Sequence, residues 1–90
     1  MDDKAERTTM FGALRREDAI SGILDLVYRA LQEKGYDPVS QLVGFLLTGD
    51  PTYITSHMGA RDVVRTVERD EVVEYLVRFY AEHLQAKGDR

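Results

Sequence analysis

The stretch that decides the fold runs from Lys34-Gly35-Tyr36-Asp37-Pro38 to Gly49-Asp50-Pro51-Thr52-Tyr53-Ile54, and the residues between its two ends are almost all apolar. At each end a Gly is followed within three residues by Asp-Pro. Gly suits the left-handed residue after a helix, and Asp-Pro suits the cap and first position of the next helix. The pattern therefore predicts a short helix over about Pro38 to Thr48. Because this helix is apolar on nearly every side, we expect it to be a core helix covered from several directions.

The composition is typical of one small soluble domain. The chain has 90 residues, of which 43% are hydrophobic and 31% charged, and it has no cysteine. Its formal charge of −4 argues against bulk nucleic-acid binding, because phosphate contact needs a basic surface. No apolar run approaches the roughly 20 residues that cross a bilayer, so we expect no membrane insertion. Since no signal peptide precedes the first charged residues, we expect a cytoplasmic protein.

The first fifteen residues show no apolar period, and we expect residues 1–15 to form a flexible tail. This tail contains two adjacent threonines, Thr8 and Thr9. They are either solvated hydroxyls without a role or acceptors for a protein kinase, to which a tail is accessible. A phosphate would add about −1.5 to −2 charges. Residues 87–90 are expected to fray, which leaves a helical domain of residues 16–86.

Further helices are predicted by apolar residues that recur at helical spacing. One helix runs from about Glu17 to Lys34, another from about His57 to Glu68, and a last one from about Asp70 to Gln85, with a break before Asp70. A single helical turn is expected over Pro51 to Ile54. The sequence therefore predicts an all-α fold, a small compact bundle of about four helices plus a short helical turn.

The apolar faces of these helices exceed what one chain of this size readily buries. The last helix is expected to bury Val72, Val73, Leu76, Val77, Tyr80 and Leu84. A homodimer doubles the core without lengthening the chain, so we expect a homodimer, the alternative being a compact monomer.

No group of residues predicts catalysis, a metal site or a cofactor site. The two imidazoles, His57 and His83, lack neighbouring carboxylates at the spacing that builds a metal site. Thr55, Ser56 and His57 are adjacent at a helix start and do not face one another, so capping is expected rather than nucleophilic catalysis. No glycine-rich phosphate loop is present. We expect a protein that is not an enzyme.

Three arginines, Arg61, Arg65 and Arg69, follow one another at intervals of four and are expected to form a row along the third main helix. Three interpretations remain open. The row makes salt bridges, with Glu71 or Glu74; it receives phosphate or carboxylate groups or a partner, for which guanidinium groups are well suited; or it lies on the reading helix of a helix-turn-helix DNA-binding protein. The acidic neighbours and the acidic chain weigh against the last interpretation.

Several short motifs follow one another in the order and spacing of a known family. They are Lys34-Gly35-Tyr36-Asp37-Pro38, Gln41-Leu42-Val43-Gly44, Gly49-Asp50-Pro51-Thr52-Tyr53-Ile54, Ala60-Arg61, Glu68-Arg69-Asp70-Glu71 and Leu76-Val77-Arg78 with Tyr80. In these motifs the chain resembles the IreB family of small bacterial regulatory phosphoproteins.

The resemblance implies a cytoplasmic, non-enzymatic, all-helical homodimer. The implied partners are a second copy of the chain, a transmembrane Ser/Thr kinase with extracellular PASTA repeats, the opposing phosphatase and a downstream protein. The implied role is that of a regulator, typically negative, in cell-envelope stress signalling. Thr8 lies three residues before Phe11, as the acceptor threonine of the family does, and Thr9 is adjacent to it. Residues 12–16 depart from the more acidic run of the family.

Overall fold

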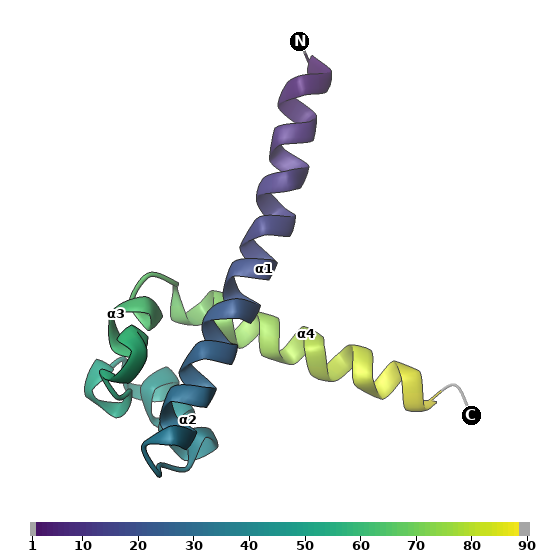
Figure 1. Ribbon diagram of the computed structural model, residues 1–90. Coiled ribbons are helices and arrows are strands. Elements are labelled where there is room, and N and C mark those ends of the chain that lie inside the picture. The colour runs from purple at the N-terminus through teal and green to yellow at the C-terminus, as the bar shows by residue number, and fades with distance from the viewer. Residues whose placement is uncertain (1, 89–90) are drawn as a thin grey trace.

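The computed structural model describes the backbone of residues 2–88 and the side chains of residues 16–88. This part of the chain is all-helical, so the predicted fold class is confirmed for it (Figure 1). Its elements are α1 (Asp2–Glu33), α2 (Pro38–Thr48), the 3-10 helices η1 (Pro51–Tyr53) and η2 (His57–Gly59), α3 (Ala60–Val64) and α4 (Arg69–Gly88).

Capping groups enclose α2 at both ends, as the sequence predicts. The Asp37 carboxylate accepts a hydrogen bond from the backbone N–H of Val39 at 3.2 Å, and Pro38 occupies the first turn. At the other end Gly49 has a φ of +77° and donates its N–H to the Phe45 carbonyl. Only Gly adopts such a left-handed conformation without a steric cost. The predicted bounds of this helix are confirmed.

The core lies where α1 meets α2, α3 and the loop after η1. Val27, Ala30 and Leu31 of α1 are fully buried, because their spacing of three and four places them on one face of the helix. Ile54, also fully buried, reaches this face directly after η1, the predicted helical turn. The remaining members of the buried cluster are Phe45, Ala60 and Val64.

The structure covers α2 on one side only, so the prediction of a core helix enclosed from several directions is wrong. Phe45 is buried, whereas Val39, Val43 and Leu47 are exposed, Leu47 to 79%. The main contacts of α2 are with α1 and η1, and these two elements leave Val39, Val43 and Leu47 uncovered.

The predicted helix from about His57 to Glu68 is also wrong in its bounds. Met58 and Gly59 have φ values of +59° and +71°, so a regular α-helix begins only at Ala60. It ends at Val64, and residues 65–68 form a turn. A break before the last helix is therefore confirmed, but its predicted place at Arg69-Asp70 is wrong, because both residues belong to α4 and the break lies at residues 65–68.

The backbone of α1 begins at Asp2, well before the predicted start near Glu17. The predicted tail covers residues 1–15, whose side chains lie outside the described part of the chain. Residues 89–90 lie outside it as well. The division into residues 1–15, 16–86 and 87–90 therefore stays a prediction.

Two helical glycines provide a matched test of this packing. A Cβ on Gly44 of α2 would lie 2.5 Å from Cε1 of Tyr53, whereas a Cβ on Gly22 of α1 meets no atom within 4 Å. Ala is favoured over Gly inside a helix by about 0.8–1 kcal/mol, so Gly22→Ala is expected to raise the free energy of unfolding by about that amount. Gly44→Ala must displace the Tyr53 ring, and overpacking costs about 1–3 kcal/mol. Urea unfolding should give Gly44→Ala a lower free energy of unfolding than Gly22→Ala, by about this cost. If both variants gained the same free energy of unfolding, the Tyr53 ring would not pack on α2.

Candidate functional site

α4 leaves the helical body, and most of its apolar side chains are exposed (Figure 1). Val72, in the first turn of α4, is buried. Tyr75 is half-buried. Six further large apolar side chains are between 41 and 62% exposed, and they are Val73, Leu76, Val77, Phe79, Tyr80 and Leu84. The prediction that α4 buries this face is therefore wrong for a single chain, because α4 extends beyond the elements that could cover it.

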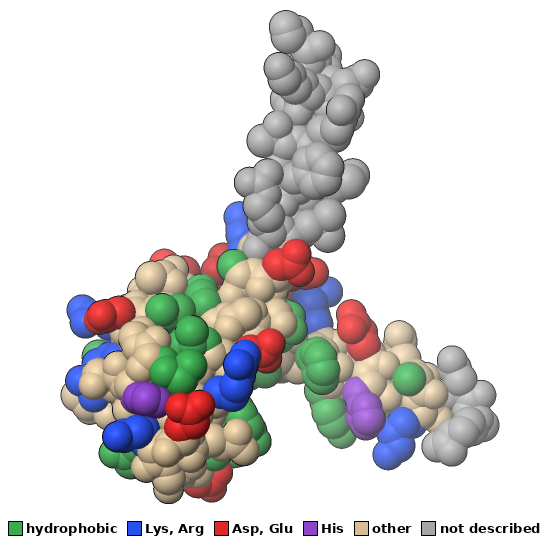
Figure 2. All heavy atoms as spheres, in the orientation of Figure 1, with side chains coloured by type: hydrophobic (Ala, Val, Ile, Leu, Met, Phe, Trp, Pro, Cys, Tyr) green, Lys and Arg blue, Asp and Glu red, His purple; other side chains and the backbone are tan. Residues whose placement is uncertain are grey.

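Five of these residues form one continuous face, which we name the α4 stripe. Its members are Val73, Leu76, Val77, Tyr80 and Leu84. Their spacing of i, i+3, i+4, i+7 and i+11 places them along one side of the helix. Figure 2 shows hydrophobic side chains along α4 where it extends beyond the body. A contiguous exposed apolar face of this kind typically marks a site of protein association.

The three arginines lie on different elements, so the predicted row along one helix is wrong. Arg61 belongs to α3, Arg65 follows the end of that helix, and Arg69 is the first residue of α4. The chain turns between them. At five residues α3 is also too short to serve as the reading helix of a helix-turn-helix protein, which must present several side chains to base edges.

Two of the arginines hold separate elements together. Arg61 donates from Nε to the Ile54 carbonyl at 2.8 Å, which ties α3 to the loop after η1. Arg69 donates from Nη1 to the Leu46 carbonyl at 3.1 Å. That carbonyl lies in the last turn of α2, where carbonyls lack a partner within the helix and a cation interacts favourably with the helix dipole. Arg69 therefore ties the start of α4 to the end of α2.

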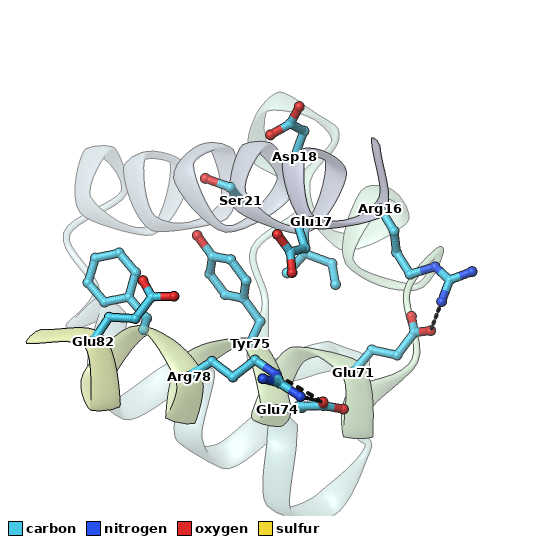
Figure 3. Close-up of a pocket in the computed structure, with 11 residues that line it drawn as sticks. Arg16, Glu17, Asp18, Ser21, Glu71, Glu74, Tyr75, Arg78 and Glu82 are labelled. Atoms are coloured by element: carbon cyan, nitrogen blue, oxygen red, sulfur yellow. Dashed lines mark hydrogen bonds and ion pairs between the residues drawn. The ribbon is translucent and has the colours of Figure 1, made fainter. Parts of the chain in front are cut away.

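Within one chain the expected salt bridges between the three arginines and Glu71 or Glu74 are not formed, and such bridges across a dimer stay a prediction. Glu71 instead lies 3.8 Å from Arg16 of α1, and Glu74 lies 2.8 Å from Arg78 on its own helix (Figure 3). Arg65 is exposed. A role of Arg61, Arg65 and Arg69 in anion or partner contact stays a prediction.

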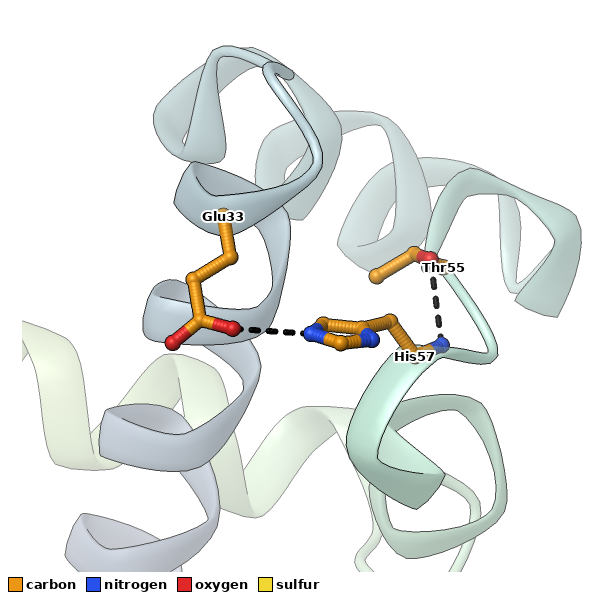
Figure 4. A network of polar contacts seen from close by, with 3 residues as sticks. All are labelled: Glu33, Thr55 and His57. Atoms are coloured by element: carbon orange, nitrogen blue, oxygen red, sulfur yellow. Dashed lines mark hydrogen bonds and ion pairs between the residues drawn. The ribbon is translucent and has the colours of Figure 1, made fainter.

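A contact that the sequence does not reveal joins the end of α1 to η2. Nε2 of His57 lies 2.8 Å from Oε1 of Glu33, and the backbone N–H of His57 donates to the Thr55 hydroxyl at 3.1 Å (Figure 4). Thr55 thus caps the turn, in line with the capping expected from the sequence. His57 and Glu33 are 24 residues apart, so no local spacing signals the pair. Among the described residues no group of three His, Cys, Asp or Glu side chains could hold a metal ion.

Asp50 caps η1 in its charged form. Hydrogen bonds from the backbone N–H and then the hydroxyl of Thr52 lower the pKa of the Asp50 carboxyl, and the positive charge of Arg61 adds to this effect. The two bonds measure 3.0 and 2.7 Å. The sequence identifies this cap correctly from the Asp-Pro pair.

Thr8 and Thr9 belong to α1, but their side chains lie outside the described part of the chain, and their role as phosphoacceptors stays a prediction. None of the described helices is both long enough and apolar enough to cross a membrane.

These features define a small all-helical protein with an exposed apolar face on α4 and with arginines that tie its elements together. The family model of the IreB regulatory phosphoprotein matches residues 6–82. This match covers most of the chain, and the protein belongs to that family. The resemblance seen in the motifs is thereby confirmed, and it supports a regulatory role. The matched range contains Thr8, Thr9 and the first four members of the α4 stripe.

Proposed function

We propose that the protein is a cytoplasmic, non-enzymatic, homodimeric regulator whose state is set by phosphate on Thr8 and Thr9. A transmembrane Ser/Thr kinase of the PASTA type adds the phosphate, and an opposing phosphatase removes it. The protein then acts, typically as a negative regulator, in cell-envelope stress signalling. The observation that carries this proposal is the match to a family of regulatory phosphoproteins over a range that includes both threonines.

The α4 stripe supports the homodimeric part of the proposal. Five apolar side chains on one helix face are exposed in the single chain, and covering them removes apolar surface from water. A second copy carries the same face, so a two-fold axis would pair each stripe with itself. The regulator is therefore a pair of chains joined through α4.

Phosphate acts in this regulator through charge. Two phosphates add about −3 to −4 charges, comparable with the formal charge of −4 of the unmodified chain. A change of this size alters which surfaces of a partner attract or repel the N-terminal segment. Of the three arginines, Arg65 is exposed and is not held by a carbonyl as Arg61 and Arg69 are, so it is the one that we assign to an anionic group of a downstream protein.

Phosphate mapping tests the assignment. The full chain is incubated with the cognate kinase and ATP, and the modified residues are identified by mass spectrometry. We expect phosphate on both Thr8 and Thr9, loss of one site in each of Thr8→Ala and Thr9→Ala, and no phosphate in the double variant. Thr66→Ala is the matched control, because Thr66 is an exposed threonine of the helical domain. Phosphate found only in the helical domain would contradict the proposal.

A further inference from the structure

A groove of about 530 Å³ lies between α1 and α4 (Figure 3). Apolar and aromatic side chains line it from both helices. Ile20 of α1 is buried, Tyr75 of α4 is half-buried, and Phe79 of α4 is 62% exposed. The groove therefore has an apolar floor that the described side chains leave partly open.

The rim of this groove is acidic. Five carboxylates and two guanidinium groups line it, which corresponds to a formal charge of −3. Glu71 and Glu74 are paired with the two arginines. The other three carboxylates have no ion pair among the described residues, and they belong to Glu17, Asp18 and Glu82.

We propose that this groove binds residues 7–15 of a second copy of the chain as long as Thr8 and Thr9 carry no phosphate. The inference rests on the proposed function, because it requires a dimer and phosphorylation of these threonines. The segment reads Arg7-Thr8-Thr9-Met10-Phe11-Gly12-Ala13-Leu14-Arg15 and has a formal charge of +2, with no acidic residue. Its arginines complement the rim, and its three large apolar residues complement the floor.

The segment comes from the second copy because of the direction of α1. Residues 16–21 of α1 line the groove, and the same helix is continuous from Asp2 to Glu33. A helix advances by about 1.5 Å per residue, so each residue before Arg16 lies farther from the groove of its own chain. Figure 1 shows this part of α1 running away from α4. A homodimer supplies a second segment that is not subject to this restriction.

Phosphorylation reverses the sign of the attraction. Two phosphates change the formal charge of the segment from +2 to about −1 to −2, and the residues that line the groove have a formal charge of −3. Like charges brought together in this way oppose binding. Phosphate on both threonines therefore releases the segment and opens the groove, which gives the proposed regulator an attached and a released state.

Photo-cross-linking in the full chain tests this docking. A benzophenone amino acid replaces Phe11, and this protein is mixed with an equal amount of the isotope-labelled unmodified chain. After irradiation, mass spectrometry identifies the partners. We expect cross-links between labelled and unlabelled chains at the α4 peptide that contains Tyr75 and Phe79. Phosphorylating Thr8 and Thr9 with the kinase should lower their yield by about tenfold, because like charges then face one another across the contact.

A charge reversal on the rim gives a second measurement. Glu17→Lys/Glu82→Lys should also lower the yield, whereas Asp62→Lys/Glu68→Lys makes the same charge change at exposed residues outside the groove and should not. Added salt should weaken the unmodified contact, since it screens exposed charges, and this measurement does not depend on the variants folding.

The outcomes separate this inference from the function on which it rests. The docking would be overturned if the cross-links joined Phe11 to α2, or if they formed only within one chain. It would also be overturned if their yield did not change after phosphorylation. If phosphate is mapped to Thr8 and Thr9 in those same samples and light scattering shows a dimer, the proposed function stands nevertheless. Absence of phosphate from both threonines would instead overturn the proposed function, and with it the release step, while the unmodified sample still decides whether the segment binds the groove.

Discussion

Leu76→Glu is expected to convert the proposed homodimer into a monomer in solution. Leu76 lies within the α4 stripe, and a two-fold dimer contains two copies of it. Burying a leucine side chain contributes about 1.5–3 kcal/mol, and a carboxylate in its place must be desolvated as well. Leu76 is 41% exposed in the single chain, so pairing buries less than half of its side chain. Counted on both chains, the lost burial raises the dissociation constant by about one to two orders of magnitude, and desolvation of the two carboxylates raises it further. Light scattering over a range of concentrations should show the mass falling to that of one chain, 10.3 kDa.

Gln85→Glu is the matched control for this variant. It introduces the same charge on the same helix, at an exposed residue nine positions after Leu76. Nine residues are two and a half helical turns, so Gln85 faces away from the stripe. We expect Gln85→Glu to remain dimeric. An unmodified chain that is monomeric at every concentration, or equal dissociation of both variants, would show that α4 does not join two copies through this face.

Leu31→Ala is expected to cause the largest loss of stability among single truncations of comparable size. Leu31 is fully buried in the cluster that joins α1 to α2 and α3. Removing a buried leucine side chain loses its transfer free energy and leaves a cavity, which together cost about 2–5 kcal/mol. Urea unfolding followed by circular dichroism should show a lower midpoint with an unchanged slope.

The same substitution at Leu47 tests whether the lost stability depends on the burial of the leucine side chain or only on its removal. Leu47→Ala removes the same atoms from α2, but Leu47 is 79% exposed. We expect the free energy of unfolding to change by no more than about 0.5 kcal/mol. If both variants lost the same stability, the core would not lie where α1 meets α2 and α3.

The sequence specifies α2 most completely, because the signals that bound it are local. Asp37 and Pro38 start this helix and Gly49 ends it, and each acts on backbone groups within four residues. The cap of η1 by Asp50 is local in the same way. Such elements can be predicted from the residue types alone.

The end of α3 could not be predicted from local pattern, because distant groups determine it. The start of α3 depends on the left-handed conformation of Met58, which residues other than Gly rarely adopt. Arg61 and Arg69 bind carbonyls that lie 7 and 23 residues before them in the chain. The prediction from helical spacing alone therefore placed the end of the third helix too late. It also placed the three arginines on one helix, although a turn separates them.

The candidate site was predictable in part. Helical spacing identified the apolar residues of the α4 stripe, but whether another helix of the same chain covers them depends on tertiary arrangement. The proposal of Thr8 and Thr9 as acceptors follows from the family resemblance rather than from the chemistry of their neighbours. The groove between α1 and α4 left no signal, because its lining combines residues 16–21 with residues 71–82.

The attachment of α4 by its first residue has a mechanical consequence. Twenty residues at about 1.5 Å each make a rod of roughly 30 Å, held at its base by the bond from Arg69 to Leu46. A tilt of about 10° at that base moves the far tip by roughly 5 Å, as the same length requires. A rotation of α4 about its first turn therefore displaces its far end much more than its base, where Arg69 holds it to α2.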